Sequence, residues 1–255
     1  MTKRNIMKII CSLVYITITI VNAAHLMKLP QGFIQCKKSD PKFDECLTNA
    51  FQKSIPHLAK GIPSLTMYKL DPFRISELQI DQGEGPVSIK LNFKELDIHN
   101  LRNLHVKKVH YDPVNFNADL EFQISIPITL DGDYDITGKV LVLPIVGKGK
   151  SKIDIFMSNI TAKVQFKPIV KNGNTYLDMT KFDWKFVVKN MNIKLTNLFN
   201  GDKALGDNMN LFLNENWRDV LNELLPSIEK VFGIAFKDAG QQFFKNIPEN
   251  QIFYA

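Results

Sequence analysis

Histidine is the residue type that most often shuttles protons or binds zinc in proteins, and this chain has five of them. No two have the spacing of the helical zinc motif His-Glu-x-x-His, in which residues four apart share one helix face. His105 and His110 instead flank a strand-like run. We interpret the histidines as surface or hydrogen-bonded residues and predict no metal site. They are His25, His57, His99, His105 and His110.

The serine and glycine patterns predict no catalytic or nucleotide-binding site. The chain lacks Gly-x-Ser-x-Gly, the turn that exposes the nucleophile of many hydrolases. Segment 147–151, GKGKS, resembles the end of a phosphate-binding loop, but the first glycine of that motif would fall on Pro144. The segment also lies between strand-like runs. We predict that it is a hairpin loop, that the protein is not an enzyme and that it has no cofactor.

The N-terminus has the pattern of a secretory signal peptide. Lys3, Arg4 and Lys8 precede an apolar run over 9–21, and Ala23 offers a small residue for cleavage. The alternative, a membrane anchor, would need about 20 apolar residues. We predict cleavage of residues 1–23, one domain over 24–255, and a secreted, extracellular protein without stable membrane insertion. The remaining net charge is 29 − 26 = +3 with scattered lysines, which argues against a nucleic-acid partner.

Two cysteines remain after removal of the signal peptide. Cys36 and Cys46 form an even pair in what would be an oxidising compartment, and a disulfide between them is the first interpretation. A redox site or a zinc site would need closer spacing or more ligands. A bridge over this short loop would contribute on the order of 3 kcal/mol. It would fix the N-terminal arm and perform no chemistry.

The elements around these residues follow from the periodicity of apolar side chains. A helix is predicted from about 47 to 59, ended by Gly61 and Pro63. Period-two alternation then predicts an antiparallel sheet covered on one face. Asp131-Gly132 and Asn172-Gly173 are hairpin signals, and phase slips near 94–95 and 189–190 predict bulges. The alternating apolar runs are 87–93, 116–126, 160–166 and 182–188.

The C-terminal part predicts the longest helix. Apolar residues recur at steps of three or four from Leu205 to Phe236, and 200–202 supplies a turn and an N-cap. The asparagines at 208, 210, 214 and 216 are expected on the wet flank. A single helix over 204–244 would be roughly 60 Å long, against a compact diameter of about 45 Å. Pro226 and Gly233 interrupt this segment, so two arrangements are open. Either two helices fold back on each other, or one kinked helix runs along an elongated molecule. The simplest architecture is a sheet that wraps around a helix.

Several segments together resemble the insect takeout / juvenile-hormone-binding protein family. They are NLFNGDKALGDNMNLFLNENW at 197–217, CKKSDPKFDECL at 36–47, LAKGIPSL, LDPFRI and IDQGEG, and the likeness covers the chain after the signal peptide. The resemblance implies an α+β fold in which a highly curved antiparallel sheet wraps around a long C-terminal helix and encloses an apolar tunnel. It also implies a secreted carrier of hydrophobic small molecules, in a family with circadian-related roles. The single bridge is as in takeout-like members, whereas juvenile-hormone carriers of moth haemolymph look to have a second.

The leading hypothesis is a carrier of a long apolar ligand, such as a juvenile-hormone-like terpenoid, a fatty acid or a related lipid. Apolar residues of the strands and the helix would line its tunnel, although plain core packing is the more common role of such residues. We choose Leu91, Phe93, Phe116, Leu120, Phe122, Val164, Phe166, Phe182, Trp184 and Phe186 from the strands, and Trp217, Leu221, Leu224, Phe232 and Phe236 from the helix.

Two other functions stay open at this level. A secreted interaction module with a packed core could act on a receptor or a membrane surface through its lysines, without a stoichiometric ligand. An esterase-like enzyme lacks a nucleophile motif. Asn159 begins the Asn-x-Thr sequon of the chain and is a candidate for glycosylation, since it occupies an outward position of a predicted strand.

Overall fold

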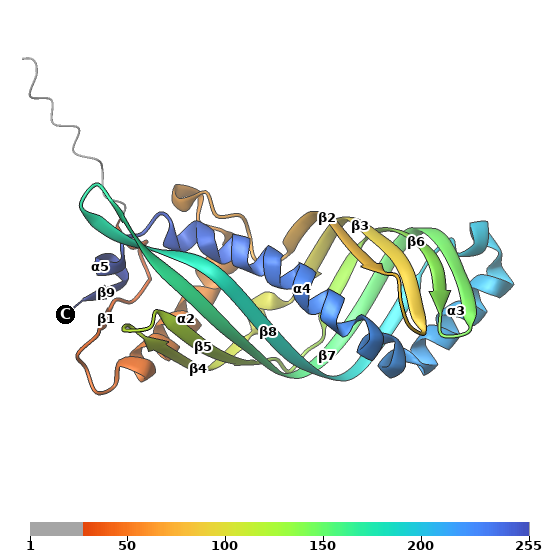
Figure 1. The fold of residues 1–255 in the computed structure, drawn as a ribbon, viewed down its shortest axis with the longest axis horizontal. Helices are drawn as coiled ribbons and strands as arrows, with labels where there is room; N and C mark the ends of the chain where they lie inside the picture. Colours follow the sequence, from red (N-terminus) through yellow and green to blue (C-terminus); the bar gives the residue numbers. More distant parts are fainter. Residues whose placement is uncertain (1–27, 255) are drawn as a thin grey trace, which may run out of the picture.

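Long antiparallel strands and one long helix make up most of the computed structural model, which describes residues 28–254 (Figure 1). The predicted signal peptide with its cleavage point, and His25, lie outside these residues. The strands are β1 (Cys36–Lys37), β2 (Phe73–Gln82), β3 (Val87–His99), β4 (His105–Asp112), β5 (Asn117–Gln123), β6 (Ile128–Val140), β7 (Leu143–Lys171), β8 (Asn174–Leu195) and β9 (Phe253–Tyr254). The α-helices are α2 (Phe43–Lys60), α3 (Lys203–Glu215), α4 (Trp217–Phe244) and α5 (Glu249–Ile252), and short 3-10 helices span Pro63–Leu65, Leu101–Asn103 and Phe199–Gly201.

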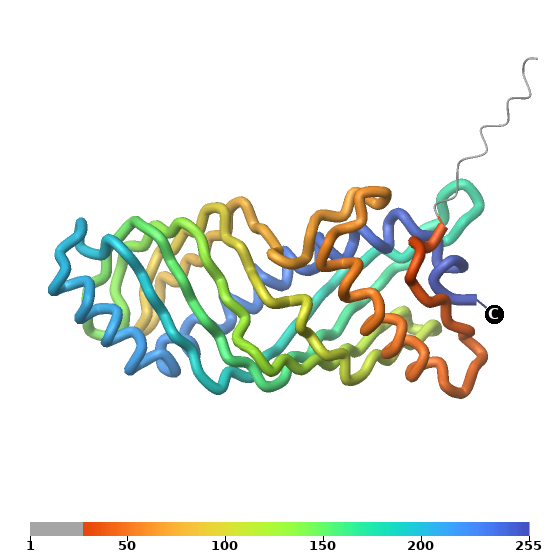
Figure 2. The backbone as a smooth tube through the Cα atoms, turned by 180° about the vertical axis from the view of Figure 1, so that it is seen from behind, coloured from red at the N-terminus to blue at the C-terminus, as the bar shows by residue number. Residues whose placement is uncertain are grey.

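The main sheet is antiparallel and has the strand order β2-β3-β6-β7-β5-β4, with β8 on the other edge of β7. At 29 residues, β7 is long enough to pair with β6 along its first half and with β5 along its second. Two smaller groups, β2-β3-β6 and β4-β5, therefore share one long β7–β8 ladder. Figure 2 shows the result, an elongated curved sheet with α4 running along it.

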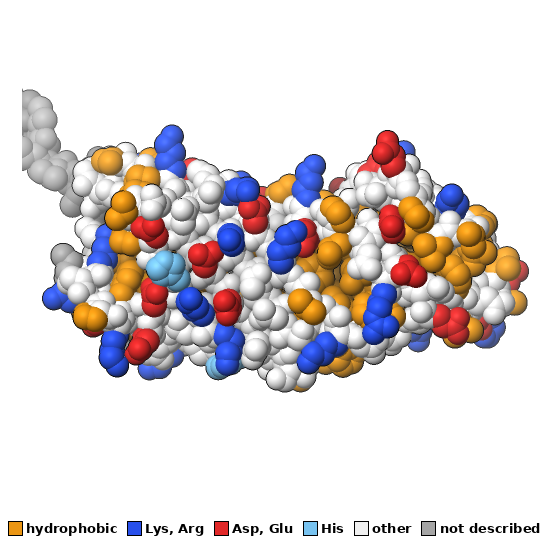
Figure 3. Space-filling view, turned by 60° about the horizontal axis from the view of Figure 1, so that its bottom comes forward, with side chains coloured by type: hydrophobic (Ala, Val, Ile, Leu, Met, Phe, Trp, Pro, Cys, Tyr) orange, Lys and Arg blue, Asp and Glu red, His pale blue; other side chains and the backbone are white. Residues whose placement is uncertain are grey.

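Charged residues on the outer face of the sheet fix its register. Asp133 and Asp135 of β6 lie opposite Lys150 and Lys148 of β7, with Nζ–Oδ distances of 2.7 and 3.3 Å. On its other side, Asp133 lies opposite Lys94 of β3. A slip of one residue would turn every side chain to the other face and break these pairs. Acidic and basic side chains are likewise interspersed on the face shown in Figure 3.

One of the two predicted hairpins is confirmed. Asn172 and Gly173 join β7 to β8, with φ of 50° and 75°, as a two-residue turn of this kind requires. The hairpin predicted at Asp131-Gly132 is wrong, because both residues lie inside β6. Gly132 lies opposite a bulge of β3, and a Cβ there would come within 3.0 Å of the Leu96 Cα. The glycine gives room to the bulge and forms no turn.

The predicted bulges are present. The pairing of β3 with β6 shifts between Lys94 and Asp97, and the pairing of β7 with β8 shifts beside Lys189. The hairpin loop predicted at 147–151 is wrong, since these residues lie in the interior of β7. Gly147 bridges Leu198, so the chain that follows β8 passes directly over this segment.

The C-terminal helical region has its break at Asn216, where φ is −107°, and α4 then runs through Pro226. Of the two arrangements that the sequence allowed, a helix along an elongated molecule is the one observed (Figure 1). Proline removes the N–H that would bond the carbonyl of Asn222. Both residues are exposed, so water can bond that carbonyl and the helix continues. Asp202 caps α3 as predicted, accepting a bond from the Leu205 N–H.

The prediction that the asparagines of α3 cover a wet flank is wrong for two of them. Oδ1 of Asn214 accepts from the Ile193 N–H and its Nδ2 donates to the Ile193 carbonyl, both at 2.7 Å. Asn210, one turn earlier, makes the same pair of bonds to Leu195, both at 2.8 Å. These amides complete the hydrogen bonds of β8 where no further strand lies beside it. Sequence periodicity cannot show this, because an amide facing water and one facing a strand edge have the same spacing.

Helix α2 covers the free edge of β4 in a similar way. Its Gln52 Oε1 accepts from the Val106 N–H at 2.8 Å, and its Thr48 Oγ1 accepts from the Val109 N–H at 2.9 Å. Polar side chains of helices therefore bond the outer backbone groups of both β4 and β8, which would otherwise bond water or another strand.

Helix α4 lies in the opening between β8 and β2, against both strands, so the sheet is open and the helix closes it. Gly233 of α4 allows a close approach to β8, because a Cβ at this position would lie 3.1 Å from the Phe182 carbonyl oxygen. The predicted α+β architecture, a curved antiparallel sheet with a long C-terminal helix along it, is confirmed.

The first and last strands of the described residues meet at one end of the elongated sheet. β1 pairs in parallel with β9, and the predicted disulfide joins Cys36 to Cys46 at the start of α2. Lys38 Nζ lies 2.6 Å from Glu249 Oε1. These contacts hold the N-terminal arm and the C-terminal residues against the same end of the sheet (Figure 2).

Candidate ligand-binding interior

The residues predicted to line a tunnel lie in two apolar clusters in the interior of the molecule. All but three belong to the larger cluster, and Phe116, Val164 and Phe166 belong to the smaller one around α2, β4 and β9. Leu120 and Phe122 contact both clusters, so the apolar interior is continuous. The predicted members of the larger cluster are Leu91, Phe93, Leu120, Phe122, Phe182, Trp184, Phe186, Trp217, Leu221, Leu224, Phe232 and Phe236.

Phe116 departs from the strand that the alternation predicted for it. It precedes β5 with a φ of 54°, and its carbonyl accepts a bond from the Phe166 N–H at 2.8 Å. Asn159 is exposed on β7, so a sequon there is accessible, and its glycosylation stays a prediction.

An aromatic wall formed by Trp184, Phe186, Phe232 and Phe236 stands where α4 meets β8. Trp184 stacks on Phe186 with a centroid distance of 4.5 Å and meets Phe236 edge to face at 5.3 Å. The indole N–H of Trp184 donates to the Glu229 carbonyl at 2.9 Å. This bond satisfies the polar atom of the ring, and the remaining surface of the wall is apolar.

A side groove that the sequence analysis missed lies between α4 and β2. Its volume is about 510 Å3, within the range of small-molecule sites. Phe73 lies in it and packs against Phe236 at 5.8 Å, which connects the groove to the aromatic wall. The rim carries Tyr68, 90% exposed, and Ile234, 53% exposed. The other lining residues are Met67, Leu70, Arg74, Ile75, Glu77, Leu78, Gln79, Val231, Ala235, Asp238, Ala239 and Gln242.

A sequence signal for the groove existed on the helix. Val231, Ala235, Ala239 and Gln242 follow each other at steps of three or four, so they share one side of α4. The partner signal was weak, because the alternation along β2 loses phase after Ile75.

The two sides of α4 are held unequally. On the β8 side, Glu229 bonds Trp184 and pairs with Lys185, and Gln241 accepts from the Met179 N–H at 2.5 Å. Gln241 also donates to Asp178 at 2.9 Å. On the β2 side, and within residues 28–254, α4 makes one side-chain hydrogen bond to the strand, in which Ser227 Oγ donates to Gln82 Oε1 at 3.0 Å. The groove lies along this more weakly bonded side.

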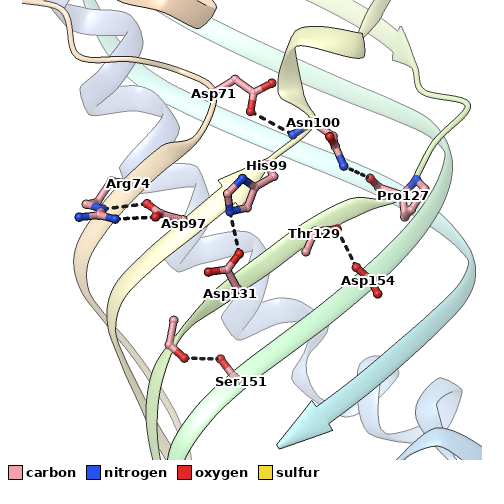
Figure 4. A network of polar contacts seen from close by, with 11 residues as sticks. Asp71, Arg74, Asp97, His99, Asn100, Pro127, Thr129, Asp131, Ser151 and Asp154 are labelled. Atoms are coloured by element: carbon pink, nitrogen blue, oxygen red, sulfur yellow. Dashed lines mark hydrogen bonds and ion pairs between the residues drawn. The ribbon is translucent and has the colours of Figure 1, made fainter.

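Ionic contacts next to the groove are shown in Figure 4. Arg74 of β2 donates to both carboxylate oxygens of Asp97, at 2.8 and 2.5 Å, and this guanidinium holds the pKa of Asp97 below its usual range. His99 Nε2 lies 2.7 Å from Asp131 Oδ2, and possible ligand atoms of Asp97, His99 and Asp131 fall within 4.8 Å of one another. Because Arg74 already neutralises Asp97 and would repel a cation, we assign these residues to ion pairing.

Helix α4, although long, is not apolar enough to cross a bilayer, and neither is any other helix within residues 28–254.

An elongated open sheet, a long helix closing it and an apolar interior with a groove at its side define the class of this protein, an α+β fold with one long helix along a curved antiparallel sheet. Residues 13–254 match the family model described as haemolymph juvenile hormone binding protein, and the chain belongs to this family. Its fold is similar to the crystal structure of Takeout 1 from Epiphyas postvittana, with a TM-score of 0.75 and 26% identity, over 87% of this chain and 99% of that one.

Curated relatives agree with this membership. The circadian clock-controlled protein daywake of Drosophila melanogaster is 28% identical over 235 residues, 88% of each chain. A putative beta-carotene-binding protein of Schistocerca gregaria is 21% identical over 216 residues, 84% of this chain and 85% of the relative. The family description and the name of the locust relative each refer to the binding of a lipophilic molecule, a hormone in one case and a carotenoid in the other.

Proposed function

We propose that this protein is a secreted carrier that buries one elongated lipophilic molecule between the sheet and α4. The observation that carries the proposal is the continuous apolar interior, whose aromatic wall adjoins the groove beside β2 through the contact of Phe236 with Phe73. The names of the family and of the locust relative, which refer to a hormone and a carotenoid, support a terpenoid, a fatty acid or a related lipid as the ligand class.

Burial of apolar surface would supply the binding free energy. At roughly 25 cal/mol per Å2, removing about 400 Å2 of ligand from water is worth about 10 kcal/mol before the costs of association. The fifteen residues chosen from the sequence remain the proposed lining, joined now by the groove residues Phe73, Ile75, Val231 and Ala235.

The direct test is native mass spectrometry of the protein, followed by organic extraction and displacement of a fluorescent fatty-acid probe. We expect one co-purified lipid-like molecule per chain, or probe binding near one to one. A bare mass without probe binding would contradict the carrier function and favour a packed interaction module that acts through its surface.

A bulky residue in the groove gives a matched test. Ala235→Trp should weaken probe binding by about tenfold or more, because overfilling a packed site typically costs 1–3 kcal/mol. Ala204→Trp, on an exposed position of α3, is the control and should bind the probe as the unaltered protein does. Equal affinities of the two variants, with both folded by circular dichroism, would refute the groove as part of the site.

A further inference from the structure

The hydroxyl of Tyr111 stands out among the buried polar groups of the molecule. Tyr111 lies on β4 with its side chain in the smaller apolar cluster, and only 4% of the residue is exposed. Among residues 28–254, no protein group hydrogen-bonds its Oη. Buried side-chain polar atoms nearly always have a partner, so an orphaned one needs an explanation.

The chain offers a comparison in Tyr134, which is also buried, on β6. Its hydroxyl donates to the Thr196 carbonyl at 2.7 Å. The fold therefore satisfies one buried tyrosine hydroxyl with its own backbone and leaves the other without a protein partner. The phenylalanine side chain would fill the position of Tyr111 equally well if only packing mattered.

The ring of Tyr111 lies at the end of the apolar interior, near the C-terminal end of α4. It stacks on Phe253 at 4.9 Å and meets Phe166 edge to face at 6.3 Å, and Phe166 in turn contacts Phe244 at 4.8 Å. Gln242, two residues before Phe244, lines the side groove. Two residues of helix rise about 3 Å and turn by about 200°, so the groove and this end of the interior lie at the same level of α4 but on opposite sides of the helix.

The charges near the hydroxyl are negative. Burial, and then the carboxylates of Glu249 and Asp112, raise the pKa of Tyr111 well above its usual value, so the hydroxyl keeps its proton and remains a donor. Glu249 already pairs with Lys38, so that lysine is engaged. A ligand carboxylate brought to this hydroxyl would lose hydration beside two like charges, whereas an uncharged oxygen would not.

We propose that Tyr111 Oη donates a hydrogen bond to an uncharged oxygen of the ligand, such as an ester, ketone or epoxide oxygen, and that this end of the interior discriminates against carboxylates. The inference rests on the proposed carrier function and deepens it, since it names the chemistry of the polar end of the ligand. The long apolar part of the ligand would extend from Tyr111 along α4 toward the aromatic wall.

The test compares three ligands of equal chain length, a long-chain methyl ester, the corresponding free acid and the n-alkane, by displacement of a fluorescent lipid probe without a carboxylate, whose own affinity is measured for each variant. Tyr111→Phe should weaken binding of the ester roughly fivefold to tenfold, the usual effect of one hydrogen bond, and leave the alkane unchanged. The unaltered protein should prefer the ester to the acid. Tyr134→Phe is the control and should not separate ester from alkane.

Thermal unfolding without ligand supplies the second measurement. Tyr111→Phe should be at least as stable as the unaltered protein, because it removes a hydroxyl without a protein partner, whereas Tyr134→Phe should be less stable. Equal loss of stability in both variants, or equal ester affinity before and after Tyr111→Phe, would overturn the inference. Failure of all three ligands to bind the unaltered protein would instead contradict the carrier function itself.

Discussion

Replacing Asn214 by alanine should destabilise the protein through the edge of β8. The change removes the two 2.7 Å bonds to the Ile193 N–H and carbonyl and puts no polar group in their place. Each bond contributes about 1 kcal/mol net, and a partly buried backbone group left unpaired adds to the loss, so the bonds account for about 2–3 kcal/mol. Alanine recovers roughly 0.5 kcal/mol through its better helix propensity. The net loss is about 2 kcal/mol.

The assay is thermal and urea unfolding of Asn214→Ala beside Asn208→Ala, measured by circular dichroism. Asn208 is exposed on the same helix, so its replacement carries the same gain in propensity without the loss of strand bonds. The variants therefore differ by the strand bonds alone, about 2.5 kcal/mol, and for a domain of this size we expect their melting temperatures to differ by about 5–10 °C, with an unchanged urea slope. If the free energies of unfolding of the two variants differ by less than about 0.5 kcal/mol, water replaces the hydrogen bonds of the Asn214 amide to β8 without loss, and the reasoning is refuted.

Two further results are expected. If the ligand enters along the groove, a cross-link between β2 and α4 should slow its uptake. We therefore expect a short bis-maleimide to slow uptake of the fluorescent probe in a Gln82→Cys/Ser227→Cys variant, on the β2 side of α4, and not in Lys185→Cys/Glu229→Cys, on the β8 side. Equal uptake rates in the two cross-linked proteins would contradict entry along the groove. The pKa of Asp97 is lower in the folded protein than its value of about 3.9 in the unfolded chain. The ionised carboxylate therefore stabilises the fold above about pH 3.9, and this stabilisation is lost as the pH falls through the pKa of the folded state. Asp97→Asn should therefore be less stable at pH 7 and approach the unaltered protein near pH 2, and a constant difference in urea midpoints over that range would disprove the assignment.

Local patterns predicted most of the fold. The alternating runs became β3, β5, β7 and β8, and the helix before Gly61 became α2. What failed were features that depend on a distant neighbour. Gly132 carries the signal of a turn, but the bulge of β3 beside it explains the glycine. Pro226 left two arrangements open, and its exposed position, which lets the helix continue, decides between them. Neither context is contained in the segment itself.

For the candidate site, the sequence predicted which side chains belong to the apolar interior, and their role in ligand binding stays a prediction. Strand alternation and helix spacing identified the side chains that face the interior, since facing inward is a property of one element at a time. The side groove depends on where α4 lies against β2. The periodicity of the segment around Phe73, or of the segment around Ala235, does not show that these two segments lie side by side. The orphaned hydroxyl of Tyr111 is harder still, because the absence of a partner can be seen only when every neighbour is placed.

The helix side chains that bond the strand edges have a consequence for how this protein behaves at high concentration. Unbonded edge strands are the usual starting points for intermolecular strand addition and for amyloid growth. Here Asn210 and Asn214 engage β8, and Thr48 and Gln52 engage β4. A second molecule could add a strand at either edge only after a helix had left it. The four side chains are uncharged, so the cover that they give these stretches of β4 and β8 does not weaken as the salt concentration rises.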